Sequence, residues 1–600
     1  MKERKEINEK YKWDLSDYCS NDEEFIKELN CLKTEIKKIK KFEGLLTENN
    51  EKEILKCLNL KTTLTEKIYR LAYYAMFRND EDLTNGKGQE LISLISSLDT
   101  DFSNLTTFII VDLNELSHEY ITYLLNNDKF KDYHRFFENI IRNKPHMLSR
   151  KEEILLSKME EFAGESSTIY HNLCDAELTF NDVLDSKGKK YKLTISTSSK
   201  YKESSDRELR KNATHELNLG FGKFNTTIAS IYANYIKELN FDSEVRKFNN
   251  SLEMSFFYEE TSLDVYNSLK TLVNNNLDIL RDMFKLKQKT LNLESFYIYD
   301  FFAPISKKFS LKLDFYDAVN LVKKSLYPLG EEYVKFVDKA VQERWFDVYE
   351  NKGKQSGAYS ATHYRLKPKI LMNYTSSASD VFTITHEFGH CMHSYYSNLA
   401  QPFTTSNYEI FVAEVASTVN EVLLLKYLIS NAKNKDEKIF YINQFLTDMI
   451  FSTIFRQTAF AEFEESAHKF YKDNKFISKD ILNNIYLDIL KKYFSESVIL
   501  LPSSQFEWCR LLHLFKNFYV YKYATGMISA LMIANGLTSQ NEEIRNKFFN
   551  GYMKFLHAGS SLPPLEILKL AGVDLEKPEV MQEAFNIARN MLNEWENLLK

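Results

Sequence analysis

The stretch VFTITHEFGHCMHSYYS, residues 381–397, contains the most informative residue spacing in the chain. His386 and His390 are four residues apart, and in an α-helix this spacing places two side chains on one face. Apolar residues recur with helical period on the opposite face: Val381, Ile384, Phe388, Cys391 and Tyr395. Ser377 and Asp380 have the spacing of a capping box just before them. The stretch is therefore predicted to be an amphipathic helix with histidines on its polar face.

The two histidines are predicted to bind one metal ion. They are separated by about 6 Å along the helix axis, so both imidazoles can reach the same ion. Glu387 points away from the line of histidines, where a carboxylate can accept a proton from a metal-activated water. His393 lies about 10 Å from His386 along the axis, so it is interpreted as a nearby polar residue and not as a ligand.

A third ligand is expected from a second helix. A metzincin would need glycine at position 393 and histidine at position 396, and the chain has His393 and Tyr396 there. The segment YEIFVAEVASTVNEVLLLKYL, residues 408–428, has helical periodicity and carries Glu414 and Glu421 on its polar face, two turns apart. Periodicity alone leaves both glutamates as candidates.

The composition predicts a mostly α-helical protein with little sheet. The 600 residues include only 16 glycines and 9 prolines, well below the usual proportions of about 7% and 5%, and long helices exclude both residues. The segment 189–201, KKYKLTISTSSKY, is predicted to be extended and to mark a weak domain boundary. The best sheet candidate consists of two extended segments, 357–364 and 369–374, separated by a turn-like stretch.

Charge and cysteine usage exclude several classes of function. The net charge of −6 is spread over interspersed acids and bases, so no nucleic-acid partner is expected. The N-terminus MKERKEINEKYKW has no apolar core, and the apolar runs are too short to span a membrane. The six cysteines are scattered and form no CxxC pair, which indicates reduced thiols and a cytoplasmic location.

The metal-binding pattern resembles that of a known family. HEFGHCMHSYYS at 386–397, followed by FVAEVAST at 411–418, is similar to the oligoendopeptidase F branch of the thimet-oligopeptidase metallopeptidases. WDLSD, SSDRELRK, SGAYS, ILMNY, FYVYKYATG and LKLAGVD resemble further landmarks of that branch in the expected order, so the resemblance covers nearly the whole chain.

The resemblance implies a mostly α fold in which two helical lobes enclose a deep substrate channel. The sheet predicted from the sequence would lie beside the HExxH helix. The weak boundary predicted near 189–201 divides the chain into an N-terminal helical region at 1–190 and a catalytic region of gluzincin type at 191–600. One Zn²⁺ per chain would be held by His386, His390 and Glu414, the position that corresponds to the family's third ligand.

The resemblance further implies residues that act on the substrate. In LLHLFKNFYVYKYATG, residues 511–526, His513, Tyr519 and Tyr523 match positions that the family places over the scissile carbonyl. Tyr519 and Tyr523 are expected on one helix face and Tyr521 elsewhere. A further family tyrosine corresponds to Gly526, so that role is absent or moved. Substrate backbone is expected to pair with the extended segments at Gly357, Ala358, Tyr359, Met372 and Asn373.

The expected function is zinc-dependent cleavage of internal bonds in short unstructured peptides, with Glu387 as general base. A metallocarboxypeptidase of the same helical superfamily is one alternative, and it would release single residues instead of internal fragments. A helical binding protein with a degenerate site is the other, although the intact His386, Glu387, His390 and Glu414 argue against it.

Overall fold

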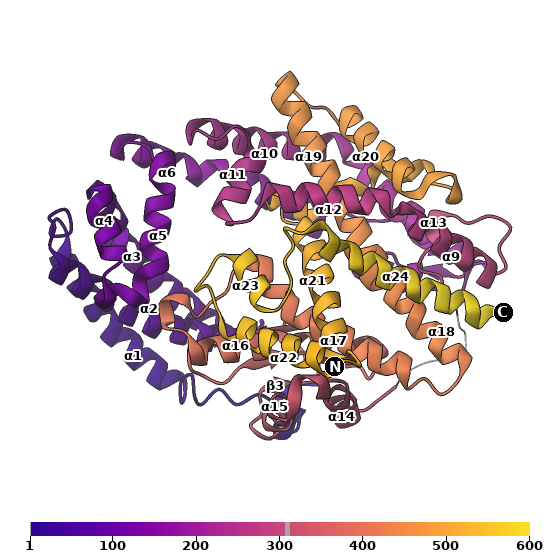
Figure 1. Ribbon diagram of the computed structural model, residues 1–600, viewed down its shortest axis with the longest axis horizontal. Helices are drawn as coiled ribbons and strands as arrows, with labels where there is room; N and C mark the ends of the chain where they lie inside the picture. Colours follow the sequence, from indigo (N-terminus) through magenta and orange to yellow (C-terminus); the bar gives the residue numbers. More distant parts are fainter. Residues whose placement is uncertain (1, 306–311) are drawn as a thin grey trace. The chain divides into compact units, whose positions relative to one another are not determined.

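The computed structural model describes residues 2–305 and 312–600, which form mainly α-helices and a few short strands (Figure 1). The mostly α fold predicted from glycine and proline usage is therefore confirmed. The chain divides into two compact units, each assembled from three segments. The first unit consists of 1–147, 310–424 and 533–573, and the second of 148–309, 425–532 and 574–600. The division predicted at residue 190 and the channel between two lobes stay predictions.

The first unit contains most of α17 and ten further helices of the described residues. They are α1 (Asp22–Glu35), α2 (Glu51–Asp80), α3 (Gly86–Glu115), α4 (His118–Leu125), α5 (His134–Asn143), α14 (Phe315–Ser325), α15 (Gly330–Gln342), α16 (Ala378–Ala400), α17 (Ile410–Ser430), α22 (Glu542–His557) and α23 (Pro564–Leu570).

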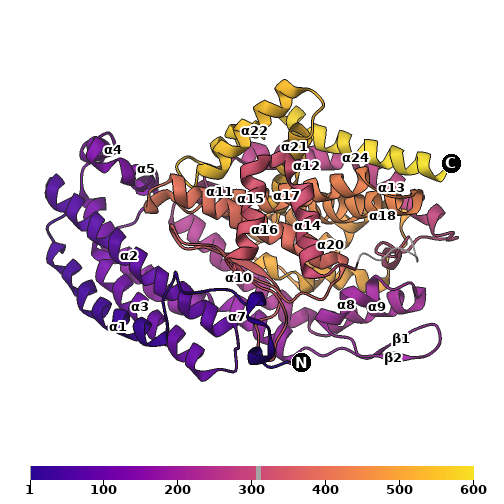
Figure 2. The same cartoon turned by 90° about the horizontal axis from the view of Figure 1, so that it is seen from below.

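The longest helices of this unit, α2 and α3, pack side by side (Figure 2). Each has 30 residues, and each begins at an asparagine whose side chain accepts a hydrogen bond from a backbone N–H of the first turn. Their buried faces join α1 in an apolar core that includes Phe25, Leu71 and Leu98. Leu371, nearly 300 positions later in the chain, belongs to the same core. The N-terminal helices thus support the segment that leads to the histidine helix.

A small sheet precedes the histidine helix, as predicted. It has the order β3-β5-β4, with β3 (Phe346–Asp347) parallel to β5 (Lys369–Leu371) and β4 (Tyr359–Ala361) antiparallel to it. Ser360 lies opposite Ile370 in the antiparallel pair. Strands β4 and β5 both pack against α16. The predicted sheet beside the HExxH helix is therefore confirmed.

The second unit contains most of α21 and twelve further helices of the described residues. They are α6 (Arg150–Ala163), α7 (Glu165–His171), α8 (Ile195–Lys202), α9 (Arg207–Lys223), α10 (Asn225–Val245), α11 (Ser251–Tyr258), α12 (Leu263–Asn275), α13 (Leu277–Thr290), α18 (Lys435–Gln444), α19 (Arg456–Asn474), α20 (Lys479–Phe494), α21 (Tyr521–Leu537) and α24 (Pro578–Leu599), and a π-helix spans Phe445–Phe455.

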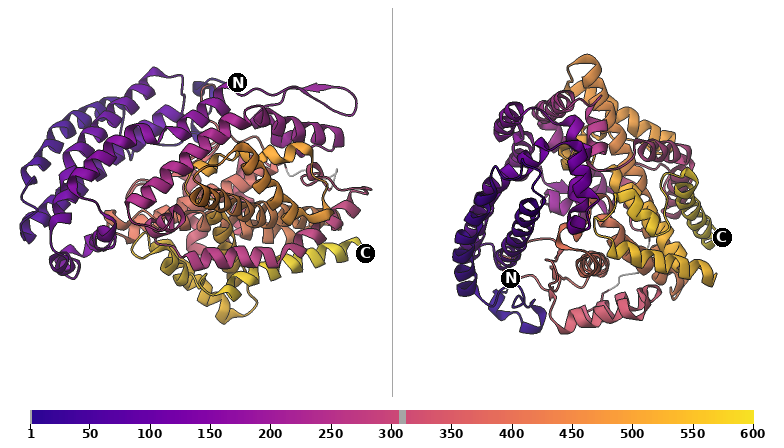
Figure 3. Two further views of the ribbon diagram at one scale, coloured as in Figure 1. Left: turned by 90° about the horizontal axis from the view of Figure 1, so that it is seen from above. Right: turned by 60° about the vertical axis from the view of Figure 1, so that its left-hand side comes forward.

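The extended segment predicted at 189–201 is only partly extended. Strands β1 (Val183–Leu184) and β2 (Lys190–Tyr191) form a short antiparallel hairpin that projects from the second unit (Figure 3). The prediction is wrong for the residues that follow, because α8 begins at Ile195. The Thr194 side chain accepts a hydrogen bond from the Thr197 backbone N–H at 3.0 Å, and this cap outweighs the β-branched composition. No helix among the described residues has the length and apolar character needed to cross a membrane.

Candidate metal centre

The histidine helix α16 begins with the predicted capping box. The Ser377 hydroxyl accepts a hydrogen bond from the Asp380 N–H at 3.3 Å, and the Asp380 carboxylate accepts one from the Ser377 N–H at 2.8 Å. Four residues of the predicted apolar stripe are at most 1% exposed: Val381, Ile384, Phe388 and Cys391. Burial of this stripe fixes the rotation of the helix and so directs His386 and His390 to the other side.

Three side chains from α16 and α17 converge on one point. His386 and His390 approach each other with their Nε2 atoms 3.2 Å apart. A Glu414 carboxylate oxygen lies 3.4 Å from each of these nitrogens. The three ligand atoms lie within 4.8 Å of one another, and no other group of this kind occurs in the described part of the chain. We call His386, His390 and Glu414 the metal-ligand cluster.

The donor atoms of the metal-ligand cluster suit a zinc ion. Two imidazole nitrogens and one carboxylate oxygen are a ligand set that zinc hydrolases use, with a fourth position left open. Burial tends to raise the pKa of Glu414, but the hydrogen bond to His390 and the charges of both histidines lower it to about 2. The carboxylate is therefore ionised and ready to bind a cation. Ser417 holds it in place by donating a hydrogen bond at 3.2 Å.

Glu421 contacts the other nitrogen of the His386 ring. Its carboxylate accepts a hydrogen bond from Nδ1, which leaves Nε2 as the atom that faces Glu414. Such a partner fixes the tautomer and the orientation of a metal-binding imidazole. Burial alone would lower the pKa of His386, but the hydrogen bond to Glu421 and the charges of Glu414 and Glu387 raise it to about 9.

Gly389 allows α16 and α17 to approach closely. A Cβ atom at this position would lie 2.4 Å from the Ser417 Cα atom and 2.7 Å from the Ala416 carbonyl oxygen, which is too close for any side chain. Glu414 starts one turn before Ser417, so the close approach brings its carboxylate to the histidines. Gly389 was not among the predicted site residues, although a glycine inside a helical pattern signals close packing.

Glu387 lies beside the metal-ligand cluster in a buried position, 7% exposed. Burial raises its pKa, and the charges of His386 and His390 oppose that rise. The backbone of Ser360 in β4 also hydrogen-bonds to the carboxylate. The small sheet therefore helps to position Glu387, a role of Ser360 that the sequence did not reveal.

His393 lies outside the metal-ligand cluster, as interpreted, but its predicted place on the polar face of the helix is wrong because the residue is buried. Its side chain is 0% exposed. The ring is stacked on Tyr408 with 3.7 Å between centroids and on Phe555 with 5.0 Å between centroids. Burial lowers the pKa of His393 to about 3, so the imidazole is neutral. Residues from α22 cover this part of α16, and the local sequence does not contain that information.

The predicted substrate-binding residues lie on and around β4 and β5. Strand β5 is the central strand, paired on both sides over 370–371, and the Met372 N–H donates to the Asp347 carbonyl at 2.9 Å. The Asn373 side chain donates to the Gly357 carbonyl, also at 2.9 Å. This sheet has two edge strands, β3 and β4, so β4 leaves one edge for an added strand. Ala358 and Tyr359 are at that edge.

His513, Tyr519 and Tyr523 come together in the second unit. The Tyr523 hydroxyl and His513 Nε2 are 3.3 Å apart, and the ring centroids of His513 and Tyr519 are 5.7 Å apart. The expectation that both tyrosines belong to one helix is wrong, because α21 begins at Tyr521. Phe518 has a left-handed φ of 46°, and its N–H donates to the buried Glu464 carboxylate at 2.8 Å.

Tyr521 does not join His513, Tyr519 and Tyr523, because its side chain is packed in the core. It is 1% exposed and is stacked on Phe256 with 4.9 Å between centroids. Its hydroxyl lies 3.2 Å from the Thr261 hydroxyl. The chain thus places Tyr521 in the core and leaves Tyr519 and Tyr523 beside His513.

Comparison with known proteins identifies the family. The model of Peptidase family M3 matches residues 200–587, and that of Oligopeptidase F matches residues 112–180. The chain belongs to peptidase family M3. It is 34% identical to Oligopeptidase PepF of Bacillus subtilis over its full length and 89% of that protein. It is 36% identical to an Oligoendopeptidase F homolog of Borreliella burgdorferi over 99% of both chains.

Solved structures of this family have the same fold. A Chlamydophila abortus protein superposes with a TM-score of 0.90 at 32% identity, with 100% of both chains covered. Oligoendopeptidase-F of Enterococcus faecium superposes with a TM-score of 0.74 at 27% identity, covering 96% of this chain and 99% of that one. The prediction of a metalloendopeptidase is confirmed by membership of family M3.

Proposed function

We propose that the protein is a zinc-dependent oligoendopeptidase that hydrolyses internal bonds of short unstructured peptides. The observation that carries this proposal is the metal-ligand cluster with the buried carboxylate of Glu387 beside it. Membership of family M3 supports peptide hydrolysis, and the names of its relatives support cleavage of oligopeptides. The choice of zinc rests on the two imidazoles and one carboxylate.

The proposed mechanism assigns the proton transfers to Glu387. When bound, Zn²⁺ supplies Lewis-acid activation of water and of the scissile carbonyl. Glu387 accepts the proton as water attacks the carbonyl carbon, and then donates it to the leaving amine. The raised pKa of Glu387 brings its proton affinity closer to neutral pH, which favours both halves of this transfer. The hydrogen bond from Ser360 limits its movement.

The remaining residues are proposed to position the substrate and to stabilise the oxyanion. His513, Tyr519 and Tyr523 would donate hydrogen bonds to the oxygen on which negative charge develops. This role rests on the family resemblance and on the mutual contacts of the three side chains. The free edge of β4 would pair with substrate backbone, a mode of binding that tolerates many side chains.

The test of this proposal removes the proton acceptor and keeps its shape. Glu387→Gln is expected to retain the fold and one zinc per chain while kcat falls by at least about 100-fold, the usual contribution of general acid–base catalysis. Glu331→Gln, an exposed glutamate on α15, is the matched control and should retain full activity. Zinc content and turnover of a quenched fluorescent peptide are measured on the same samples. Activity of Glu387→Gln near that of the control would contradict the assignment.

The product profile separates the proposal from an exopeptidase. Mass spectrometry of digested peptide mixtures should show internal fragments, whereas a metallocarboxypeptidase would release single residues. A parallel digest with a chelator should show no new fragments, because the metal is required.

We also propose a cytoplasmic location, which is supported by six cysteines that all remain unpaired.

A further inference from the structure

The second unit contains a pocket that the proposed mechanism does not use. All of its lining residues belong to that unit, and they come from α8, α9, residues 298–302, the π-helix Phe445–Phe455, α19, α20 and the segment 504–510. Its volume is about 60 Å³, several times the roughly 10–15 Å³ that one water requires. Much of the wall is aromatic, with Phe301, Phe302, Phe451, Phe460, Phe494 and Tyr493. The pocket therefore has room and apolar surface for a small organic molecule.

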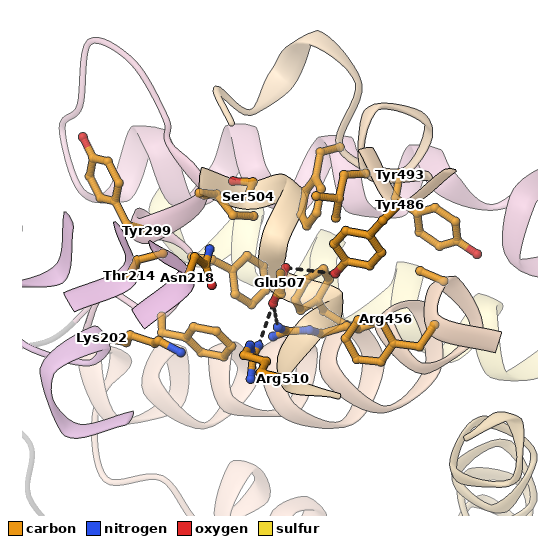
Figure 4. Close-up of a pocket in the computed structure, with 18 residues that line it drawn as sticks. Lys202, Thr214, Asn218, Tyr299, Arg456, Tyr486, Tyr493, Ser504, Glu507 and Arg510 are labelled. Carbon is orange, nitrogen blue, oxygen red and sulfur yellow. Dashed lines mark hydrogen bonds and ion pairs between the residues drawn. The ribbon is translucent and has the colours of Figure 1, made fainter. Parts of the chain in front are cut away.

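One side of the pocket carries a group of charged side chains (Figure 4). Arg456 and Arg510 both pair with one carboxylate oxygen of Glu507, Arg510 at 2.6 Å. The Tyr486 hydroxyl donates to the other oxygen at 3.0 Å. Burial would raise the pKa of Glu507, but the positive charges of Arg456 and Arg510 lower it to about 2. A single carboxylate thus balances two guanidinium groups.

Lys202 adds a third positive charge to the same pocket (Figure 4). Across the described part of the chain, its ammonium group has no hydrogen bond and no ion pair, and the neighbouring Glu203 is solvent-exposed. Burial is the largest cause that lowers the pKa of Lys202, and the charges of Arg510 and Arg456 lower it too. The weaker attraction of Glu507 and Glu203 opposes them, and the pKa falls to about 7. An unpaired ammonium in such surroundings is unfavourable, and a bound anion would relieve it.

Arg510 also has unused hydrogen-bonding capacity. Its Nε atom is buried and has no hydrogen-bond partner. Buried guanidinium nitrogens are normally satisfied, and one that is not calls for a ligand or an ordered solvent molecule. Lys202 and Arg510 therefore both offer donors that the protein itself leaves free, next to an aromatic wall.

We propose that this pocket binds a small organic carboxylate, held by Lys202 and Arg510 with its apolar part against the aromatic wall. Charge-assisted hydrogen bonds from an ammonium and a guanidinium are the strong interactions available to a carboxylate. The aromatic wall favours an anion with an apolar body over inorganic phosphate, which would gain nothing from it. The site belongs to the second unit and does not depend on the proposed peptidase mechanism.

The test uses benzoate as the probe and measures binding to the full-length protein by isothermal titration calorimetry. Lys202→Met removes the unpaired ammonium without disturbing the pairing of Glu507, and Lys202→Arg restores a positive charge. Lys200→Met is the matched control, because Lys200 is exposed on the same helix. Benzamide and inorganic phosphate serve as the neutral and the purely anionic comparison. Circular dichroism and thermal unfolding verify that each variant is folded.

We expect saturable binding of about one benzoate per chain, weakened at least about tenfold by Lys202→Met, as loss of one charge-assisted hydrogen bond predicts. Binding should be unchanged in Lys200→Met and recovered in Lys202→Arg. Three results would overturn the proposal. The first is no saturable binding up to about 10 mM benzoate, where binding is too weak to be specific. The second is equal affinity for benzamide. The third is equal or tighter binding of phosphate, with displacement of benzoate.

Discussion

Glu414 and Glu421 contact the same imidazole at different ring nitrogens. Glu414 faces Nε2 of His386, and Glu421 hydrogen-bonds to Nδ1. The sequence placed both glutamates on the polar face of one predicted helix and could not distinguish them, because periodicity gives a direction around the axis and no distance to another helix. The family resemblance favoured Glu414, and the position of its carboxylate beside both histidines supports that choice. The two residues are therefore expected to affect metal binding differently.

The first prediction compares alanine variants at these two positions. Glu414→Ala should weaken zinc binding most, since it removes a charged ligand atom. Glu421→Ala should retain zinc with an affinity reduced by about 10- to 100-fold, the usual effect of losing the partner of a metal-binding histidine. Zinc titration against a competing chelator measures both variants. If Glu421→Ala loses the metal and Glu414→Ala keeps it, the assignment is wrong.

The second prediction concerns the pH dependence of metal uptake. The pKa of His386 in the metal-free protein is raised to about 9, so the ring carries a proton at neutral pH. Metal binding must displace that proton, and apparent zinc affinity should fall by about tenfold or more per unit as pH decreases from about 8 to 6. Calorimetry in buffers of different ionisation enthalpy measures the protons released. Release of no proton at neutral pH would contradict the prediction.

Among the secondary-structure elements, α16 was predicted best, whereas the packing of other elements around it was not predicted. Its capping box, its apolar stripe and its histidine pair all follow from residues within one stretch of the chain. The burial of His393 does not, because it depends on Phe555 of α22. The start of α21 after Tyr519 was missed for a similar reason, since Glu464 on α19 holds the preceding turn.

The third prediction tests the contact between α16 and α17. Gly389→Ala should weaken zinc binding and lower thermal stability, because the added Cβ must push Ser417 away and Glu414 with it. Gly526→Ala is the matched control, because a Cβ there meets nothing within 4 Å. In a helix interior this control should be neutral or stabilising by up to about 1 kcal/mol. Equal zinc affinity of Gly389→Ala and the wild type would show that the helices do not depend on this contact.

At the scale of the whole molecule, composition predicted the class of fold and missed how the chain is assembled. Low glycine and proline content was sufficient for a mostly α protein. The first unit, however, joins segments from three parts of the sequence. Arg4 pairs with Asp347 at 2.6 Å, and Leu371 shares a core with α1, α2 and α3. Contacts over such separations leave no periodic signal in either partner, so no local pattern could reveal them.

The reactivity of the thiols should differ between the folded and the unfolded protein. Of six free cysteines, only Cys31 is exposed, and the other five are at most 5% exposed. The thiolate is the reactive form, and burial raises the pKa of Cys509 to about 12 and that of Cys391 still more clearly above its usual value. A colorimetric thiol reagent should therefore modify one sulfur rapidly in the native protein and all six in denaturant.

Replacement of Cys31 by serine should abolish the rapid phase, whereas two or more rapid thiols in the native wild type would contradict the burial of the remaining five. With Cys31 replaced, the slow labelling of Cys391 would measure how often α16 opens, because this sulfur directly follows His390 in the sequence. Slower labelling of Cys391 in the presence of zinc would then show that the bound metal reduces how often α16 opens.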